Sequence, residues 1–261
     1  MQQSCPEVSV AVYDDNSTDN TRELEVKYPN VHWEFGEQNR GYVYARNKFM
    51  SESTTTYFCS LDDDSWFIKY DSLAKSIDYL DNNLDVAAIA FDILSPDRSN
   101  EVKEGRPVEV NSFIGCGHVV RLSQVRQVGF YDPPPSYYGG EEKDLCIRLI
   151  DKGHKVMLLP GVHVWHDKTN VARNITAQHR SGICNDMVFT WRRTPLLLLF
   201  PVLIAKFANH LRFAVRYKEE KLIRPCIQGF TDFLRALLKG KLNRHPVSMK
   251  AFKKFLTLVK I

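Results

Sequence analysis

The sequence of 261 residues lacks the glycine-rich motifs by which many nucleotide-binding proteins hold phosphates. It contains neither GxxxxGK[ST] nor GxGxxG, so it does not fit a P-loop or a dinucleotide-binding fold. It has no internal repeat and no low-complexity tract. Its longest apolar run, 195–205, is about half of the ~20 residues that cross a bilayer. Any phosphate ligand must therefore be held by other chemistry.

Paired cysteines are also missing. The chain has six cysteines and no CxxC pair, which indicates reduced thiols in a cytosolic protein and not a disulfide or zinc framework. These residues are Cys5, Cys59, Cys116, Cys146, Cys184 and Cys226. No signal peptide precedes the first predicted strand, which agrees with a cytoplasmic location.

The charge is divided unevenly along the chain. Residues 168–261 hold 19 Lys/Arg and 4 Asp/Glu, so their net charge is +15, whereas the whole chain carries only +4. The acidic part of the chain before residue 168 can bind a metal ion. The basic C-terminal part favours binding to an anionic membrane surface. Nucleic acid is a less supported partner, because no recognised binding motif is present.

Apolar strands alternate with helices over the first two thirds of the chain, and this order predicts an α/β fold with a mostly parallel sheet. The predicted strands are 8–13, 31–35, 57–61, 86–91, 112–121, 155–159 and 162–165. The predicted helices are 19–28, 42–51, one from 72, 123–128 and 141–151. Residues 92–110 are polar and are expected to form an irregular surface segment.

The composition changes at about residue 169, so we expect a domain of residues 1–168 and a basic helical region of 169–261. Its helices are predicted at 196–217, with a kink at Pro201, and at 225–239 and 247–259. The apolar part of the first helix is too short to span a bilayer, which favours an interfacial helix at the inner face of the membrane. Packing of this helix on the sheet domain fits the pattern equally well.

The strand at 57–61 ends in Asp62-Asp63-Asp64, and three adjacent carboxylates repel one another. A divalent cation would neutralise them, because Mg²⁺ and Mn²⁺ bind a few carboxylates and complete their shell with water and phosphate oxygens. A solvated acidic turn is the alternative. In a parallel sheet this strand end shares one edge with Asp14-Asp15, Asn39-x-Gly41, Glu141-Glu142 and His163-x-Trp165-His166. Such an edge suits a diphosphate held by a cation.

These motifs and their order resemble the family 2 glycosyltransferases of the GT-A fold. The resemblance covers roughly residues 8–167. It rests on Tyr13-Asp14-Asp15-Asn16-Ser17-Thr18-Asp19-Asn20-Thr21, Asn39-Arg40-Gly41 with Ala45-Arg46-Asn47, Leu61-Asp62-Asp63-Asp64, Gly129-Phe130-Tyr131-Asp132, Gly140-Glu141-Glu142-Lys143-Asp144-Leu145 and Val164-Trp165-His166. It implies transfer of a sugar from a nucleoside diphosphate to an acceptor hydroxyl with inversion, in cell-surface polysaccharide or lipopolysaccharide synthesis on a lipid-linked or glycan acceptor.

The resemblance assigns roles by position. The nucleotide-sugar pocket would contain Asp15, Asn39, Gly41, Arg46, Asp62, Asp63 and Gly140. The Mg²⁺ or Mn²⁺ site would contain Asp62, Asp64 and His166, with Asp64 as the more direct ligand. Each has a plainer alternative, because Asp15 can cap a turn, Arg46 can form a surface ion pair and His166 can be structural.

The general base implied by the resemblance is Glu142, where most members have aspartate, and Asp144 is a supporting candidate. A carboxylate suits a group that takes the proton of an attacking hydroxyl. Which of Glu141 and Glu142 points inward stays open, and both would also be favourable charges at a helix N-terminus.

The chain departs from the family at its beginning, because Asp14-Asp15 follows only 13 residues. Either the first strand-helix unit is missing or residues 7–12 fuse two strands. Since that unit helps to build the nucleotide-base pocket, a non-catalytic binding protein that has lost donor affinity is the main alternative function. A nucleotidyltransferase is a third possibility, although its glycine-rich basic loop is absent.

Overall fold

The computed structural model describes residues 3–5, 7–98, 105–136, 139–168, 174–216 and 220–261. Its strands are β1 Ala11–Asp14, β2 His32–Phe35, β3 Tyr57–Leu61, β4 Ser65–Phe67, β5 Val86–Leu94, β6 Val108–Glu109, β7 Gly117–Arg121 and β8 Lys155–His166. Its α-helices are α1 Glu23–Lys27, α2 Tyr42–Glu52, α3 Ser72–Asn82, α4 Leu122–Val128, α5 Glu141–Asp151, α6 Ile175–Arg193, α7 Leu196–Arg216, α8 Glu220–Leu238 and α9 Met249–Thr257. Short 3-10 turns occupy Asn20–Arg22 and Pro96–Arg98.

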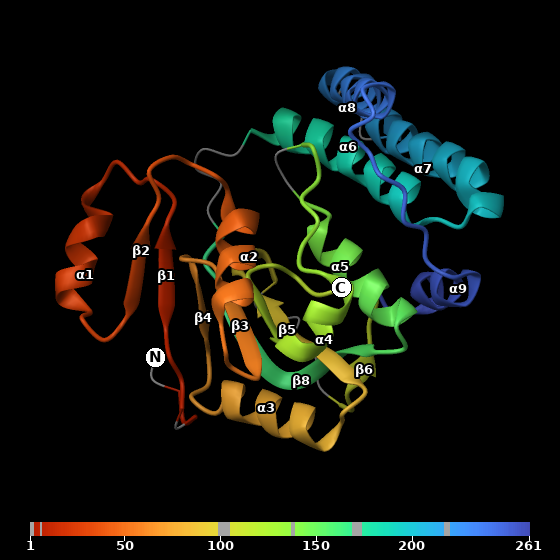
Figure 1. Cartoon of the computed structure of the whole chain (residues 1–261). Coiled ribbons are helices and arrows are strands. Elements are labelled where there is room, and N and C mark those ends of the chain that lie inside the picture. The colour runs from red at the N-terminus through yellow and green to blue at the C-terminus, as the bar shows by residue number, and fades with distance from the viewer. Residues whose placement is uncertain (1–2, 6, 99–104, 137–138, 169–173, 217–219) are drawn as a thin grey trace.

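The main sheet has six strands in the order β3-β7-β5-β8-β4, with β6 paired to β8 (Figure 1). Its central strands β5 and β8 are parallel, and β7 is antiparallel to both β3 and β5. Every residue of β5 is buried, which is expected of a strand covered on both faces. The predicted α/β fold is confirmed.

Successive residues of β5 point to opposite faces of the sheet, so one strand contributes to two cores. Ala88 and Ala90 belong to a core with residues of α2, α4 and α5. Ile89, Phe91 and Ile93 belong to a core with residues of α3. The small alanines on one side allow three helices to approach the sheet closely, and α5 is thereby fixed with its N-terminus toward the candidate site.

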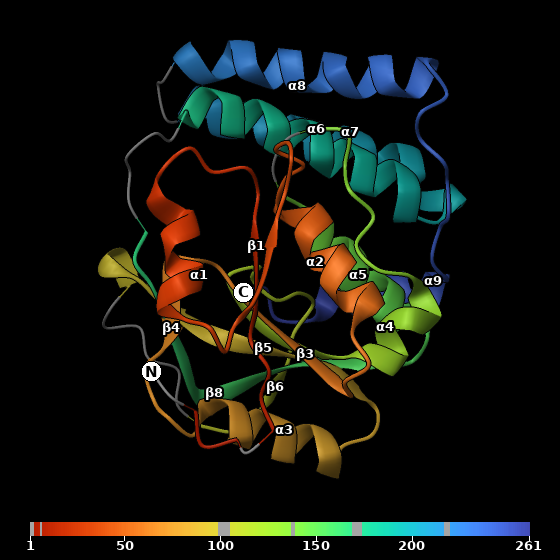
Figure 2. The same ribbon diagram turned by 60° about the vertical axis from the view of Figure 1, so that its left-hand side comes forward.

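Strands β1 and β2 form a separate, parallel two-stranded sheet beside the main one (Figures 1 and 2). Within the described ranges no strand precedes β1, and no strand pairing connects the two sheets. The small sheet packs instead on α2, where Tyr13 makes edge-to-face contacts with Tyr44 and Phe49.

The C-terminal helices form a layer of their own above the sheet, with α8 lying along α6 and α7 (Figure 2). Phe233 and Ala236 of α8 share a core with Met187 and Val188 of α6. The helix α9 packs on α5 through Phe252. Helix α5 is therefore common to both parts of the molecule.

Several predicted boundaries are corrected by long-range contacts. Residues 92–94 continue β5 as buried strand, because Asp92 lies against His163 of β8, whereas 99–104 of the predicted surface segment lie outside the described residues. The strand predicted at 112–121 begins only at Gly117, and the two predicted last strands are one strand that runs through Pro160-Gly161. Helix α8 begins before Pro225, because packing on α6 outweighs the hydrogen bond that proline removes.

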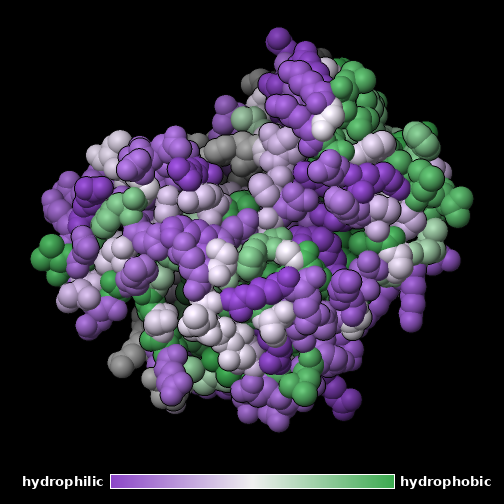
Figure 3. Space-filling model, in the orientation of Figure 1, coloured by the Kyte–Doolittle hydropathy of each residue, from purple (hydrophilic) through white to green (hydrophobic). Residues whose placement is uncertain are grey.

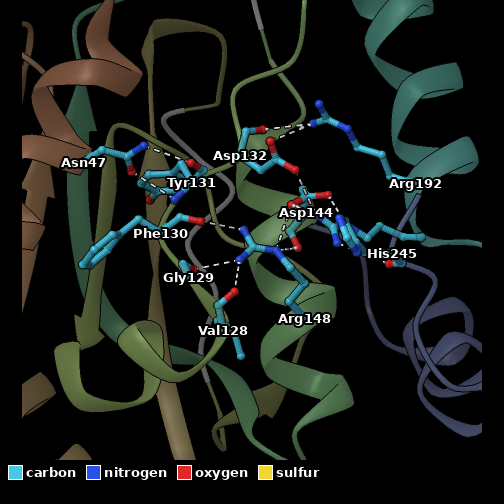
Figure 4. A network of polar contacts seen from close by, with 11 residues as sticks. Asn47, Val128, Gly129, Phe130, Tyr131, Asp132, Asp144, Arg148, Arg192 and His245 are labelled. Carbon is cyan, nitrogen blue, oxygen red and sulfur yellow. Dashed lines mark hydrogen bonds and ion pairs between the residues drawn. The ribbon is translucent and has the colours of Figure 1, made fainter. Parts of the chain in front are cut away.

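Buried ion pairs fasten α5 to α6 (Figure 4). Arg193 Nε and Nη2 donate to the two carboxylate oxygens of Asp144 at 2.6 and 3.0 Å, and Nη2 also reaches Asp132 at 3.0 Å. Arg148 donates to Asp144 and to the carbonyls of residues 128–130. Asp144 and Arg193 are almost fully buried, so both charges depend on these partners.

We expect Arg193→Met to lower the free energy of unfolding by about 3–5 kcal/mol, because it leaves part of the Asp144 charge buried without its partner. Chemical denaturation would measure the change. Arg235→Met is the matched control, since Arg235 is mostly exposed and pairs at the surface with Asp232, and it should change stability by about 0.5 kcal/mol or less. Equal effects of the two substitutions would contradict the structural role given to Arg193.

Candidate active site

The acidic turn after β3 has a defined geometry. Ser65, the first residue of β4, accepts a hydrogen bond from the backbone N–H of Asp62 at 2.8 Å, and its hydroxyl is 2.9 Å from the Asp62 carbonyl and 3.0 Å from that of Cys116. Ser65 is buried, so it fastens the turn to the sheet from below. Asp62 and Asp64 are half-buried and Asp63 is exposed. The turn therefore holds its carboxylates at the edge of the sheet and out of the core.

Asp64 and His166 are brought together at this edge. His166 is the last residue of β8 and pairs in register with Ser65 of β4, which places its Nε2 atom 3.2 Å from Asp64 Oδ1. The other ring nitrogen is 3.6 Å from the Cys116 sulfur. Burial raises the pKa of Cys116 to about 12, so this neighbour stays a neutral thiol.

This pair fits a divalent cation in its donor types and spacing. Ligand atoms about 2.1 Å from an octahedral ion lie roughly 3 Å from one another, close to the observed separation. Within the residues that the structure describes, no group of three His, Cys, Asp or Glu side chains is positioned to hold a metal. Asp62 points to Arg46 instead. Two protein ligands would suit Mg²⁺ or Mn²⁺ only with water and substrate oxygens in the remaining positions.

Arg46 of α2 lies at the centre of the site and is only 7% exposed. Its Nη2 atom donates to Asp62 Oδ1 at 2.5 Å and to the Gly115 carbonyl at 3.0 Å. Its Nη1 atom is 3.9 Å from Glu142 Oε1, and its guanidinium lies over the Tyr42 ring. One buried cation thus connects the acidic turn with the N-terminus of α5. A Cβ atom at Gly115 would come within 3 Å of Glu142 Oε1 and Arg46 Nη1, so both side-chain ends would have to shift.

Glu141 and Glu142 have different environments. Gly140 precedes α5 in the left-handed conformation (φ 104°), which turns the chain into the helix. Glu141 is 1% exposed and accepts a hydrogen bond from the Tyr42 hydroxyl. The Glu142 side chain is 18% exposed and faces Arg46. Of the two, Glu142 is the one that a small solute can reach.

The environment of Glu142 favours its protonated form. Burial, followed by repulsion from Glu141, raises its pKa to about 8, although Arg46 acts in the opposite direction. The same burial and the same neighbour raise the pKa of Tyr42. A carboxylate that is costly to ionise but open to solvent is the expected condition of a general base.

The predicted nucleotide pocket is only partly assembled. Both carboxylate oxygens of Asp15 accept backbone hydrogen bonds, from Arg40 and from Gly41, at 2.7 Å each. Gly41 has φ 82° and directly precedes α2, so Asp15 holds the turn that positions Arg46. Asn39 is exposed beside this turn. In this structure Asp15 thus orders the turn that leads into α2.

Asp144 does not face the two glutamates. Its oxygens are held by Arg148 and Arg193, so its observed role is to join α5 and α6. The sequence reasoning missed Tyr42, Ser65 and the buried pair of His118 and Tyr131, whose Nε2 and hydroxyl are 2.8 Å apart. Tyr42 could have been noted because it directly follows the Asn39-Arg40-Gly41 motif.

Known proteins resemble this chain in both sequence and fold. Residues 1–124, just under half of the chain, match the family described as glycosyl transferase family 2. A segment of 85 residues is 34% identical to the putative teichuronic acid biosynthesis glycosyltransferase TuaG of Bacillus subtilis. That match covers 31% of this chain and 33% of TuaG, so it spans about a third of the relative's length.

Two solved structures have the same fold. Residues 1–349 of TarS from S. aureus align with a TM-score of 0.61 over 90% of this chain and 73% of that one, at 15% identity. The mannosyltransferase PcManGT from Pyrobaculum calidifontis, in complex with GDP-Man and Mn²⁺, aligns with a TM-score of 0.56 over 95% of this chain and 69% of that one, at 17% identity. The chain thus has the GT-A fold. Residues 1–124 are thus similar to family 2 glycosyltransferases, in agreement with the resemblance seen in the motifs.

The raised pKa of Glu142 predicts a pH-dependent stability. The folded chain holds this proton more tightly than the unfolded chain, whose pKa is near 4.5, so the free energy of unfolding falls as pH rises from about 4.5 to 8. In Glu142→Gln this loss is absent, and the stability of the variant relative to wild type should increase by more than about 1 kcal/mol between pH 5 and pH 9. Urea titrations across this range would measure it. Glu52→Gln on the exposed end of α2 is the control, and a difference independent of pH would show that Glu142 ionises normally.

Proposed function

We propose that the chain is a metal-dependent, inverting glycosyltransferase that moves a sugar from a nucleoside diphosphate to an acceptor hydroxyl. The observation that carries the proposal is the position of Arg46. It lies between the acidic turn, where a donor diphosphate would be held, and Glu142, which would deprotonate the acceptor. The GDP-Man and Mn²⁺ bound to PcManGT and the UDP bound to TarS support a donor of this class.

The chemistry follows from what each residue can do. Glu142, once ionised, accepts the proton of the acceptor hydroxyl while the oxygen attacks the anomeric carbon from the side opposite the diphosphate. The bond between that carbon and the diphosphate oxygen breaks, and the nucleoside diphosphate leaves with the electron pair. Arg46 keeps Asp62 oriented and balances the charge of Glu142. Tyr42 holds Glu141 away from the reacting groups through its hydrogen bond. Positioning and charge therefore account for most of the proposed catalysis.

Asp64 and His166 would hold the metal ion. When bound, Mg²⁺ or Mn²⁺ would supply positive charge to the diphosphate of the donor. Asp62 would contact the ribose or a metal-bound water, with Asp63, Asn39 and Gly41 nearby in the nucleotide pocket.

The acceptor is proposed to be a lipid-linked or glycan chain in cell-surface polysaccharide synthesis. TuaG is described as a teichuronic acid biosynthesis glycosyltransferase, which supports this setting. The alternative is a non-catalytic binding protein. Two observations favour it: both Asp15 oxygens are already used by the protein, and β1 is separate from the main sheet.

A thermal-shift titration with UDP, GDP and dTDP, each with and without Mn²⁺, tests the proposal. One nucleotide should raise the melting temperature only in the presence of metal, because a ligand that binds the native state stabilises it by mass action. At a free nucleotide concentration of 100 times Kd, binding should raise the free energy of unfolding by about 2.7 kcal/mol. Asp64→Ala should abolish the shift.

Asp97→Ala is the matched control, since Asp97 is an exposed carboxylate in the turn after β5. It should leave the nucleotide shift unchanged. No shift with any nucleotide in the wild-type chain would favour the non-catalytic alternative.

We further propose that α7 places the protein on the cytoplasmic face of a membrane. Among the described residues it is the one helix that is long and apolar enough to cross a membrane by length and composition, and little of its most apolar part is buried. Leu197, Phe200 and Ile204 are each more than 60% exposed on one side of the helix. Figure 3 shows apolar surface gathered at this corner, over α7 and α8. The adjoining side carries Leu203 and Phe207, which pack with residues of α6 and α8, and this partial burial supports interfacial attachment.

Phe200→Glu should reduce sedimentation of the protein with vesicles of anionic phospholipid by about tenfold or more, because burial of one such aromatic side chain contributes about 1.5–3 kcal/mol. Leu84→Glu, at an exposed leucine between α3 and β5, is the control and should bind as wild type does. Unchanged vesicle binding of the α7 variant would exclude this face as the attachment surface.

A further inference from the structure

A cavity of about 430 Å³ lies where the N-terminus of α5 meets α6 and α7. This volume is within the range of small-molecule sites. Its lining includes Gly139, Gly140, Lys143, His179, Asp186 and His210. Apart from Gly140, none of them was predicted as a site residue, and none belongs to the acidic turn or to the Asp64–His166 pair.

The polar groups around this cavity carry an excess of positive charge. The Asp186 carboxylate accepts hydrogen bonds from Lys143 and, at 2.6 Å, from Lys206, and His210 Nε2 is 3.2 Å from its other oxygen. Among the described residues no second carboxylate pairs with either lysine. One anion therefore serves two ammonium groups, and all four side chains are at most 29% exposed.

Excess charge in a partly buried cluster is unfavourable unless a counter-charge is supplied. His179 adds a second polar group that lacks a partner. Its Nε2 atom is buried and makes no hydrogen bond within the described part of the chain. Its ring lies 6.4 Å from that of His210, and burial followed by His210 lowers its pKa, so it is neutral near pH 7. A neutral imidazole can donate its N–H to an anion.

The cavity shares a wall with the candidate catalytic groups. The Gly139 N–H donates to the Tyr42 hydroxyl at 3.4 Å, and that hydroxyl donates to Glu141. Asn185 of α6 holds the Gly139 carbonyl at 2.8 Å, which fixes this wall from the other side. Lys143 directly follows Glu142 in α5. A molecule in the cavity would therefore approach Glu142 from the side of α6, away from the strand edge with Asp64 and His166.

We infer that this cavity binds an anionic group of the acceptor, a phosphate or a carboxylate, and so presents the acceptor hydroxyl to Glu142. The inference rests on the proposed function and names the class of acceptor. A second hollow of about 590 Å³ lies along α6, around Arg180 and Asp232. It leaves space for further units of an extended acceptor. The bound anion neutralises the positive charge of Lys143 and Lys206 that Asp186 alone does not balance.

The test uses histidine side chains of the full chain as local reporters in proton–carbon NMR spectra. Inorganic phosphate and glucuronate are titrated separately at ionic strength held constant with sodium chloride. We expect one or both anions to shift the His179 and His210 resonances saturably while His154, at the start of β8, does not respond. Saturation with phosphate alone assigns a phosphate-bearing acceptor, and saturation with glucuronate alone assigns a carboxylate-bearing one.

Lys143→Met removes the unmatched charge and leaves Asp186 with Lys206, so the anion should bind about tenfold more weakly or worse. Lys254→Met, which removes the same charge from a pair with Glu109 on the far side of α5, should bind as wild type does. His179→Phe keeps a ring of similar size and removes the nitrogen, and it should also weaken binding. Linear shifts equal to those of sodium chloride, or full binding by Lys143→Met and His179→Phe, would overturn the inference.

The same spectra separate this inference from the donor proposal. His166 reports on the acidic turn, and a nucleotide with Mg²⁺ should shift His166 without needing Lys143. If phosphate saturates His179 and His210 while no nucleotide moves His166, the cavity binds anions and the donor proposal fails. If a nucleotide moves His166 and neither anion moves His179 and His210, the donor proposal stands and the anionic acceptor is excluded.

Discussion

The buried guanidinium of Arg46 is the interaction on which the candidate site depends. It is reached from three separate parts of the chain: the turn after β3 through Asp62, the segment before β7 through Gly115, and the N-terminus of α5 through Glu142. Its own position depends on the turn that Asp15 holds with two backbone hydrogen bonds. Because the cation is almost fully buried, its partners are held in a fixed arrangement, and a bound donor would find them already in place.

Helix α5 gives this arrangement its connection to the rest of the molecule. Its first turn carries Glu141 and Glu142, its inner face packs on the sheet, and Asp144 and Phe252 of α9 join it to the C-terminal helices. A shift of those helices would therefore displace Glu142 as well, because α5 is a single rigid element that connects them. The proposed membrane surface lies on α7, the cavity is lined by residues of α5, α6 and α7, and the candidate base Glu142 lies in the first turn of α5.

Much of the fold and part of the site could be predicted from the sequence. The acidic turn after an apolar strand, the glycine before Glu141 and the position of His166 are local patterns, and each lies where the motifs indicated. What could not be predicted depends on distant partners. Asp92 looked like the start of a loop because the buried His163 that it meets is 71 residues away. Asp144 was taken for a supporting catalytic group because nothing near it in the sequence reveals Arg193, which is 49 residues away.

The separate β1–β2 sheet has a consequence for how the site would recognise a base. Within the described residues, each strand of this sheet is hydrogen-bonded to the other along one edge only. A two-stranded sheet by itself is only marginally stable in water. The order of the Asp15 turn therefore comes from aromatic contacts with α2 more than from the sheet. Local opening of this unit costs less than unfolding of the core, so amide hydrogens of β1 and β2 would exchange with solvent sooner than those of β5. A ligand bound at the Asp15 turn would therefore also slow the exchange of these amide hydrogens.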